Sequence, residues 1–294
     1  MSTENIAHEK RYRDWWAQYN AMFAPENRSP QQDEQFPLTD GYSIRSKAYT
    51  YDGDLHLCGS EVIVRVNSIE TPMFLADLAA VVPQKPDLIM LPKTCTAEDI
   101  QMLAQTLDRL EAENGLPAGA VGILALIETA LGVENAFSIA SASPRVQALF
   151  LGAEDLSADL HCKRTKEGAE IQYARTRLVM AARAAGIDVY DTPFTDVDDD
   201  EGLCADAALA KSLGFTGKAA ISPRHLGNIN RCFSPTQAEV DHANEVLAAL
   251  EEGKRQGRGA VALHGKMIDA PIAARAKRTL ADAEQILKRG GTLA

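Results

Sequence analysis

The chain of 294 residues has little of several features that mark other protein classes. Aromatic residues make up only 6% of it, and no stretch approaches the roughly eighteen consecutive apolar residues of a membrane-spanning helix. The N-terminal segment Met-Ser-Thr-Glu-Asn-Ile is polar and no apolar run follows it, so a secretory signal is not predicted. We therefore expect a protein that has no membrane partner and is not secreted.

Cysteine pairing motifs are also missing. The five cysteines are odd in number, widely spread and free of any C-x-x-C pair, which argues against a disulfide framework or a zinc site. They are typical of reduced thiols, and we expect a cytoplasmic protein. These residues are Cys58, Cys95, Cys162, Cys204 and Cys232.

The chain has fewer basic than acidic residues: 30 Lys and Arg against 41 Asp and Glu, which gives a formal net charge of −11. Nucleic acids and anionic membranes bind basic surfaces, so neither is an expected partner. A small anionic substrate is still compatible with this charge, since a bound metal and a few Arg or Lys side chains can reverse the local sign.

The first 60 residues differ from the remainder of the chain. A helix is predicted over His8–Phe23, and the polar stretch Ala24–Asp40 is typical of a linker. Trp15 and Trp16 lie in this helix. Their pattern is more typical of a terminal helix that docks on the body than of an interaction surface.

From residue 61 onward, short apolar runs alternate with longer helical ones, which predicts a parallel sheet in an α/β fold. Six such units favour a TIM-type (β/α) barrel, and no G-x-G-x-x-G follows a strand to suggest dinucleotide binding. A seventh strand is predicted near Tyr42–Tyr51 and no eighth is found, so the barrel either closes in an unusual way or lacks an N-terminal βα unit. The predicted strands are Glu61–Val66, Leu88–Leu91, Gly122–Ile127, Ala148–Leu151, Ile187–Tyr190 and Lys218–Ile221. The predicted helices are Pro72–Val82, Ala97–Asn114, Val133–Ser141, Glu170–Ala185, Asp200–Leu213 and Arg224–Cys232.

Two further helices, Pro235–Gln256 and Ala270–Lys288, follow the last predicted strand. They have no place inside a barrel, so they must cover one of its ends or reach a neighbouring subunit. We therefore divide the chain into an atypical N-terminal segment (1–60), a barrel body (61–233) and a C-terminal helical extension (234–294).

Charged residues stand at the ends of four consecutive predicted strands: Arg65, Lys93, Glu128 and Asp155. The carboxyl ends of parallel barrel strands form the functional rim, so these side chains are expected together. Two carboxylates suit Mg²⁺, and the lack of a His cluster argues against zinc. The alternative is a structural ring in which both carboxylates pair with Arg65 and Lys93. Spacing alone does not decide between the two.

Longer motifs surround these residues. The stretches VIVRVNSIETPMFLADL, DLIMLPK, ALIETALGVENAFSIASASPRVQALFLGAEDLSADL and GAVALHGKMIDAPIAARA occur in this order between Val62 and Lys288. In these motifs the chain resembles the HpcH/HpaI aldolase and citrate lyase β-subunit family, especially its branch that acts on CoA thioesters. These motifs are specific for the family but do not identify the substrate.

The resemblance implies a role for each rim residue. Glu128 and Asp155 would be ligands of Mg²⁺, with Mn²⁺ as an alternative. Arg65 would be catalytic and would bind the substrate through the carboxylate or enolate of the oxo acid. Lys93 would bind the same oxygens or pair with Glu128. Asp269, in the MIDAP motif, would be a catalytic acid/base that the C-terminal extension brings to a neighbouring subunit.

The implied activity is that of a Mg²⁺-dependent carbon–carbon lyase. Its substrate would be a 3-hydroxyacyl-CoA of the citryl-, malyl- or citramalyl-CoA type, and its products acetyl-CoA or a similar thioester and a 2-oxo acid. A malyl-CoA-type thioesterase, a CoA-free class II pyruvate aldolase and a non-catalytic paralogue are the alternatives. A homotrimer or homohexamer is expected by the same resemblance.

The start of the chain departs from the family. Members open with an Arg-Ser strand motif and a second strand that ends in Glu-Asp, whereas here Arg45-Ser46 is followed by no Glu-Asp pair before Arg65. His264 also stands where the family often has Asp. These departures are the reason to keep a non-catalytic paralogue among the alternatives.

Overall fold

The computed structural model describes residues 61–256, 260–288 and 291–294. The helix predicted over His8–Phe23 and the strand predicted near Tyr42–Tyr51 lie outside these ranges. Within them the chain forms two compact units, and the first ends at Val189.

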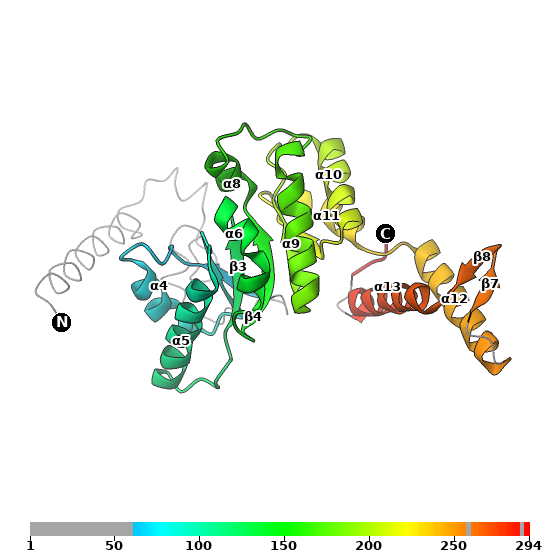
Figure 1. Ribbon diagram of the computed structural model, residues 1–294, viewed down its shortest axis with the longest axis horizontal. Helices are drawn as coiled ribbons and strands as arrows, with labels where there is room; N and C mark the ends of the chain where they lie inside the picture. Colours follow the sequence, from blue (N-terminus) through cyan, green and yellow to red (C-terminus); the bar gives the residue numbers. More distant parts are fainter. Residues whose placement is uncertain (1–60, 257–259, 289–290) are drawn as a thin grey trace, which may run out of the picture. The chain divides into compact units, whose positions relative to one another are not determined.

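The first unit contains short parallel strands separated by helices (Figure 1). Its strands are β1 Ile63–Arg65, β2 Leu88–Leu91, β3 Gly122–Ile127, β4 Val146–Leu151 and the start of β5 Asp188–Asp191. Its helices are α4 Phe74–Val81, α5 Ala97–Glu113, α6 Ala130–Glu134, α7 Ala136–Ala140, α8 Ala153–Asp159 and α9 Gln172–Ala185, with single 3-10 turns at Val82–Gln84 and Ala169–Ile171.

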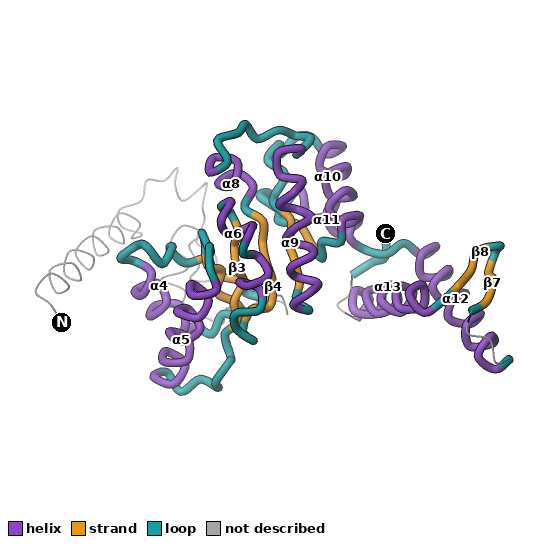
Figure 2. The backbone as a smooth tube through the Cα atoms, in the orientation of Figure 1, coloured by secondary structure: helices purple, strands orange, loops and turns teal. Residues whose placement is uncertain are grey.

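The strands pair in chain order, from β1 to β6 (Figure 2, orange). The register is parallel, with Ile63 opposite Leu88 and Leu88 opposite Gly122. All six residues of β3 are buried, as expected of a central strand covered on both faces. The α/β class and the parallel sheet predicted from the sequence are therefore confirmed.

Helix α5 shows why the sequence folds locally as it does. Thr96 caps it by accepting from the backbone N–H of Asp99, whose side chain accepts from the N–H of Thr96 in return. Ile100, Leu103 and Leu107 recur at helical spacing and are buried. Helix α9 lies against β4, with α6 and α7 beside it (Figure 1).

The second unit runs from Tyr190 to Ala294. It contains the end of β5, α10 Asp200–Leu213, β6 Gly217–Lys218, α11 His225–Phe233, α12 Gln237–Arg255, β7 Val261–Leu263, β8 Lys266–Ile268 and α13 Ala270–Lys288. Helices α12 and α13 pack on each other, and a shared core stabilises them (Figure 1). That core consists of Ala243, Val246, Leu250, Ile268 and Ala276.

The segment between α12 and α13 is an antiparallel hairpin that the sequence pattern did not predict. Leu263 pairs with Lys266, so only His264 and Gly265 form the turn, and both have positive φ, as a type I′ turn requires.

Helix α8 was also missed, and the predicted helix Val133–Ser141 is interrupted at Asn135. The last strand of the sheet is shorter than predicted, because pairing ends at Lys218.

No helix in the described part of the chain combines the length and the apolar character that crossing a bilayer demands.

Candidate functional site

Four neighbouring strands bring charged residues to one edge of the sheet in the first unit. Arg65 is the last residue of β1, and Lys93 lies two residues beyond β2. Glu128 directly follows β3, and Asp155 lies in the first turn of α8, after β4. Because all these strands are parallel, their carboxyl ends meet at the same rim.

Glu128 is the buried member of this group, with 4% of its surface exposed. Its Oε1 accepts a hydrogen bond from the backbone N–H of Lys93 at 2.8 Å. Gly152 also lies close to it, since an added Cβ there would come within 2.7 Å of the Glu128 Cβ and 2.8 Å of its Oε2. The carboxylate therefore occupies a fitted space between the loops that follow β2 and β4.

Burial raises the pKa of the Glu128 carboxyl above its usual range, and the neighbouring Asp155 raises it further. The Lys93 amide and the positive charge of Arg65 act in the opposite direction. The structure thus brings Glu128, Asp155 and Arg65 within electrostatic reach of one another, as the strand-end pattern predicted. The roles assigned to these residues from the family resemblance stay predictions.

This arrangement fits a hard divalent cation. Two adjacent carboxylates repel each other, and a buried one is costly to keep charged unless a cation compensates it. Among the residues that the structure describes, no group of three or more His, Cys, Asp or Glu side chains could hold a metal. A site with two carboxylates leaves several coordination positions to water and substrate oxygens, which is the usual way that Mg²⁺ is bound.

Lys93 contributes through its backbone. It adopts a left-handed conformation with φ of 52°, which is unusual for a residue other than glycine, and its N–H donates to Glu128. The side chain is exposed. Its ammonium can therefore contact a ligand at the rim while the amide orients the buried carboxylate.

Polar side chains also join the loops around Glu128. The Cys95 thiol lies 3.2 Å from the Thr129 hydroxyl, and the Asn135 side chain donates to the Cys95 carbonyl at 2.9 Å. Asp159 accepts from the backbone N–H of Ala130 at 2.7 Å. Sequence reasoning missed these residues because nothing in their type or spacing distinguishes them from ordinary loop residues.

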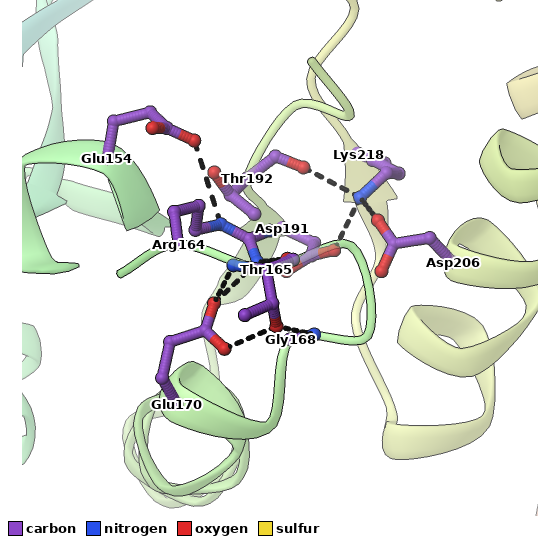
Figure 3. A network of polar contacts seen from close by, with 9 residues as sticks. All are labelled: Glu154, Arg164, Thr165, Gly168, Glu170, Asp191, Thr192, Asp206 and Lys218. Atoms are coloured by element: carbon purple, nitrogen blue, oxygen red, sulfur yellow. Dashed lines mark hydrogen bonds and ion pairs between the residues drawn. The ribbon is translucent and has the colours of Figure 1, made fainter. Parts of the chain in front are cut away.

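The loop after α8 is fixed by a carboxylate (Figure 3). Glu170 accepts from the Arg164 guanidinium at 2.7 Å and from the backbone and hydroxyl of Thr165. Although burial opposes it, these bonds lower the pKa of Glu170 to about 2. Arg164 also lies 3.6 Å from Glu154, the neighbour of Asp155. The start of α8 is thereby tied to an ordered loop.

A second polar group in Figure 3 belongs to the second unit. The Lys218 ammonium lies 2.7 Å from Asp191 and 2.5 Å from Asp206, and it donates to the Thr192 carbonyl. All three charged side chains are buried. Asp191 stands at a strand end, and its carboxylate pairs with Lys218.

Asp269, the predicted acid/base residue, immediately precedes α13 in the second unit. Its Oδ1 accepts from the backbone N–H of Ile272 at 3.4 Å, so it occupies the N-cap position of that helix. His264, where the family often has Asp, contacts Glu245 at 3.1 Å. The catalytic role of Asp269 stays a prediction.

The chain is similar to known proteins. The family model for HpcH/HpaI aldolase/citrate lyase matches residues 45–223. The chain is 41% identical to the citrate lyase subunit beta of Leuconostoc mesenteroides subsp. cremoris over 87% of each chain. It is 34% identical to the (3S)-malyl-CoA thioesterase of Cereibacter sphaeroides over 78% of this chain and 76% of that protein.

Among solved structures, the chain is similar to the CitE protein of Mycobacterium tuberculosis in complex with magnesium, acetoacetate and coenzyme A. The two are 31% identical, with a TM-score of 0.63 over 76% of this chain and 78% of the other. The family match, over residues 45–223, therefore contains all four rim residues.

Proposed function

The chain belongs to the HpcH/HpaI aldolase/citrate lyase family and is a carbon–carbon lyase, and on this basis we propose that it cleaves a 3-hydroxyacyl-CoA in a Mg²⁺-dependent reaction. The products are acetyl-CoA or a similar thioester and a 2-oxo acid. The observation that carries this proposal is the buried Glu128 carboxylate, anchored by the Lys93 amide beside Asp155 and Arg65.

Glu128 and Asp155 would hold the metal. Mg²⁺ bound there supplies Lewis-acid stabilisation of negative charge on the substrate oxygens. The Lys93 amide keeps one Glu128 oxygen fixed, so the carboxylate needs little reorganisation when the metal binds. Manganese, which accepts the same oxygen ligands, is an alternative occupant.

The residues of the chain account for the other requirements of the reaction. The C2–C3 bond of the acyl chain breaks, the 3-hydroxyl loses its proton to become the new carbonyl, and C2 gains a proton. Arg65 binds the carboxylate of the forming 2-oxo acid, because a guanidinium matches a carboxylate in charge and shape. Asp269 of the partner subunit handles the proton at C2.

The first substrate to test is citryl-CoA, because the 41% identical relative is a citrate lyase subunit beta. The binding of CoA is supported by the similar structure solved with coenzyme A and magnesium. Malyl-CoA and citramalyl-CoA share the same 3-hydroxyacyl core and are the next candidates.

Thioester hydrolysis is a second candidate, favoured by the 34% identical (3S)-malyl-CoA thioesterase. The products separate the two reactions. A lyase releases a 2-oxo acid and leaves the thioester intact in acetyl-CoA, whereas a thioesterase releases free CoA thiol and the hydroxy acid.

The test is to incubate the purified full chain with Mg²⁺ and the three acyl-CoAs, and to measure 2-oxo acid, acetyl-CoA and free thiol separately. A CoA-free hydroxy-2-oxo acid in the same panel tests aldolase activity. We expect 2-oxo acid and acetyl-CoA in equal amounts, with Glu128→Gln inactive and the neighbouring Glu154→Gln active. A natively folded protein that releases none of these products would be a non-catalytic paralogue.

A further inference from the structure

Helices α10 and α11 of the second unit pack side by side (Figure 1). Each contributes a cysteine at their contact. Cys204 is the fifth residue of α10, and Cys232 is the penultimate residue of α11. Both are free thiols and both are partly exposed, so a small reagent can reach them.

The Cys232 thiol contacts the backbone of Cys204. The Cys232 Sγ lies 3.9 Å from the Cys204 carbonyl oxygen, within the range of a weak sulfur hydrogen bond. Burial raises the pKa of the Cys232 thiol, and the Cys204 thiol beside it raises that pKa further by charge repulsion and hydrogen bonding. The positive charges of Arg231 and Lys211 partly oppose this shift.

We propose that Cys204 and Cys232 form a reversible dithiol–disulfide site that responds to peroxide. Cys232 stays protonated because its pKa is raised, so the Cys204 thiol is the one that loses its proton and attacks hydrogen peroxide as a thiolate. This forms a sulfenic acid and releases hydroxide, which takes up that proton and becomes water. The second thiol then attacks the sulfenic sulfur, its own proton leaves with the hydroxyl group as water, and the S–S bond forms. Two thiols are oxidised and one peroxide is reduced to two molecules of water.

The surrounding structure favours this pair over others. Cys95 and Cys162 belong to the first unit, and Cys95 already contacts Thr129. Cys232 lies in the last turn of its helix, the part of a helix that frays most readily, so its backbone can adjust to disulfide geometry. The bond would join positions 28 residues apart and enclose β6 with the buried Lys218. The proposal does not depend on which reaction the enzyme catalyses.

The test is to treat the folded full chain with hydrogen peroxide, block remaining thiols with N-ethylmaleimide, and digest with trypsin without reduction. The two cysteines fall in separate tryptic peptides, Ala184–Lys211 and Cys232–Lys254. We expect these peptides linked, with a mass two hydrogen atoms below their sum, and released by dithiothreitol. The oxidised chain should also show a higher Tm, because the bond restricts the unfolded state.

Two variants control the experiment. Cys204→Ser should abolish the linked peptide, and Cys162→Ser, which removes an exposed thiol of the first unit, should leave it unchanged. The proposal is overturned if both peptides carry maleimide after oxidation, or if either cysteine is linked to a third. It is equally overturned if the link forms only in urea, because the native geometry would then not support it.

Discussion

Glu128 shows how much of the proposed metal site is arranged by single residues before any ligand binds. Its carboxylate is fixed by one amide and confined by one glycine, and the neighbouring Asp155 adds negative charge that Arg65 offsets only in part. The sequence pattern identified Glu128, Asp155 and Arg65 because charged residues at barrel strand ends are conspicuous. It did not reveal Gly152 or the Lys93 amide, because neither a small residue nor a backbone N–H carries a signal of its own.

Gly152→Ala tests the confinement of Glu128. The added methyl would meet the Glu128 side chain at 2.7 Å, so the carboxylate must shift away from its position beside Asp155. We expect Mg²⁺ affinity to fall about 10- to 100-fold, as for other residues that orient metal ligands. Titration of Mg²⁺ by calorimetry measures this fall. Gly227→Ala is the control, since its methyl would meet nothing within 4 Å, and equal affinities in the two variants would contradict the account.

The raised pKa of Glu128 also predicts that the ionised carboxylate, the form that would bind a metal, makes the metal-free fold less stable. A carboxyl whose pKa is higher in the folded than in the unfolded state stabilises the fold below its unfolded pKa, and this contribution is lost as the pH rises through its folded pKa. Near neutral pH, and without metal, Glu128→Gln should therefore raise the Tm, and the difference should disappear toward pH 4. Thermal unfolding in EDTA from pH 4 to 8 measures this, and a lower Tm for the variant at pH 7 would refute it.

At the scale of elements, the first unit is held together at the opposite end of its strands by Arg145. Its guanidinium donates to Glu111 at 2.8 and 2.6 Å and to the Val121 carbonyl at 2.8 Å, and it pairs with Asp108. Helix α5 is thereby joined to the starts of β3 and β4. Burial alone would raise the pKa of Glu111, but the bonds from Arg145, Val121 and Gly119 lower it.

Arg145→Ala should lower the free energy of unfolding by about 3–5 kcal/mol, because it leaves the buried Glu111 carboxylate without its cation. Urea denaturation near neutral pH measures the loss. The loss should shrink as the pH falls through the depressed pKa of Glu111, because Glu111 then becomes protonated in the wild type and its pairing with Arg145 no longer adds stability. Arg109→Ala removes an exposed ion pair of the same helix and should change stability by less than about 0.5 kcal/mol. Similar losses in both variants would show that burial of the pair does not matter.

Elements with strong local signals were predicted well, and short ones were not. Helix α10 and strands β2 and β3 have the predicted bounds, because long periodic runs and continuous apolar runs are distinct patterns. Helix α8 has only seven residues and follows a strand without a side-chain cap, so its sequence resembles a loop. The hairpin between α12 and α13 has three-residue strands, too short for an alternating pattern to emerge.

At the scale of the whole molecule, the charge balance and the site are consistent with each other. The chain carries a net charge of −11, yet Arg65 and Lys93 lie at the rim beside the carboxylate pair. A divalent cation there would make the rim locally positive and suited to an anionic oxo acid. The family could be predicted from motifs over most of the chain, whereas the substrate could not, because the motifs report the shared chemistry of cleavage.

The proposed role of Asp269 requires more than one subunit, and the expected trimer or hexamer would provide it. If each site combines Glu128 of one subunit with Asp269 of the next, mixing inactive Glu128→Gln and Asp269→Asn chains should restore activity. After random exchange, half of the sites have an intact Glu128 and, independently, half have an intact Asp269. About a quarter of wild-type activity is therefore expected. Activity after mixing and subunit exchange is the measurement. No recovery, with exchange confirmed by mass, would place Asp269 outside a shared site.

The claim that Glu128 and Asp155 form a Mg²⁺ site is tested most directly by calorimetric titration of the metal into the wild type, Glu128→Gln, Asp155→Asn and Glu154→Gln. All three are isosteric changes, and Glu154 is the exposed neighbour of Asp155 that lies 3.6 Å from Arg164. We predict one saturable Mg²⁺ site in the wild type and in Glu154→Gln, and no detectable binding in the other two. Binding that persists unchanged in Glu128→Gln would contradict the account.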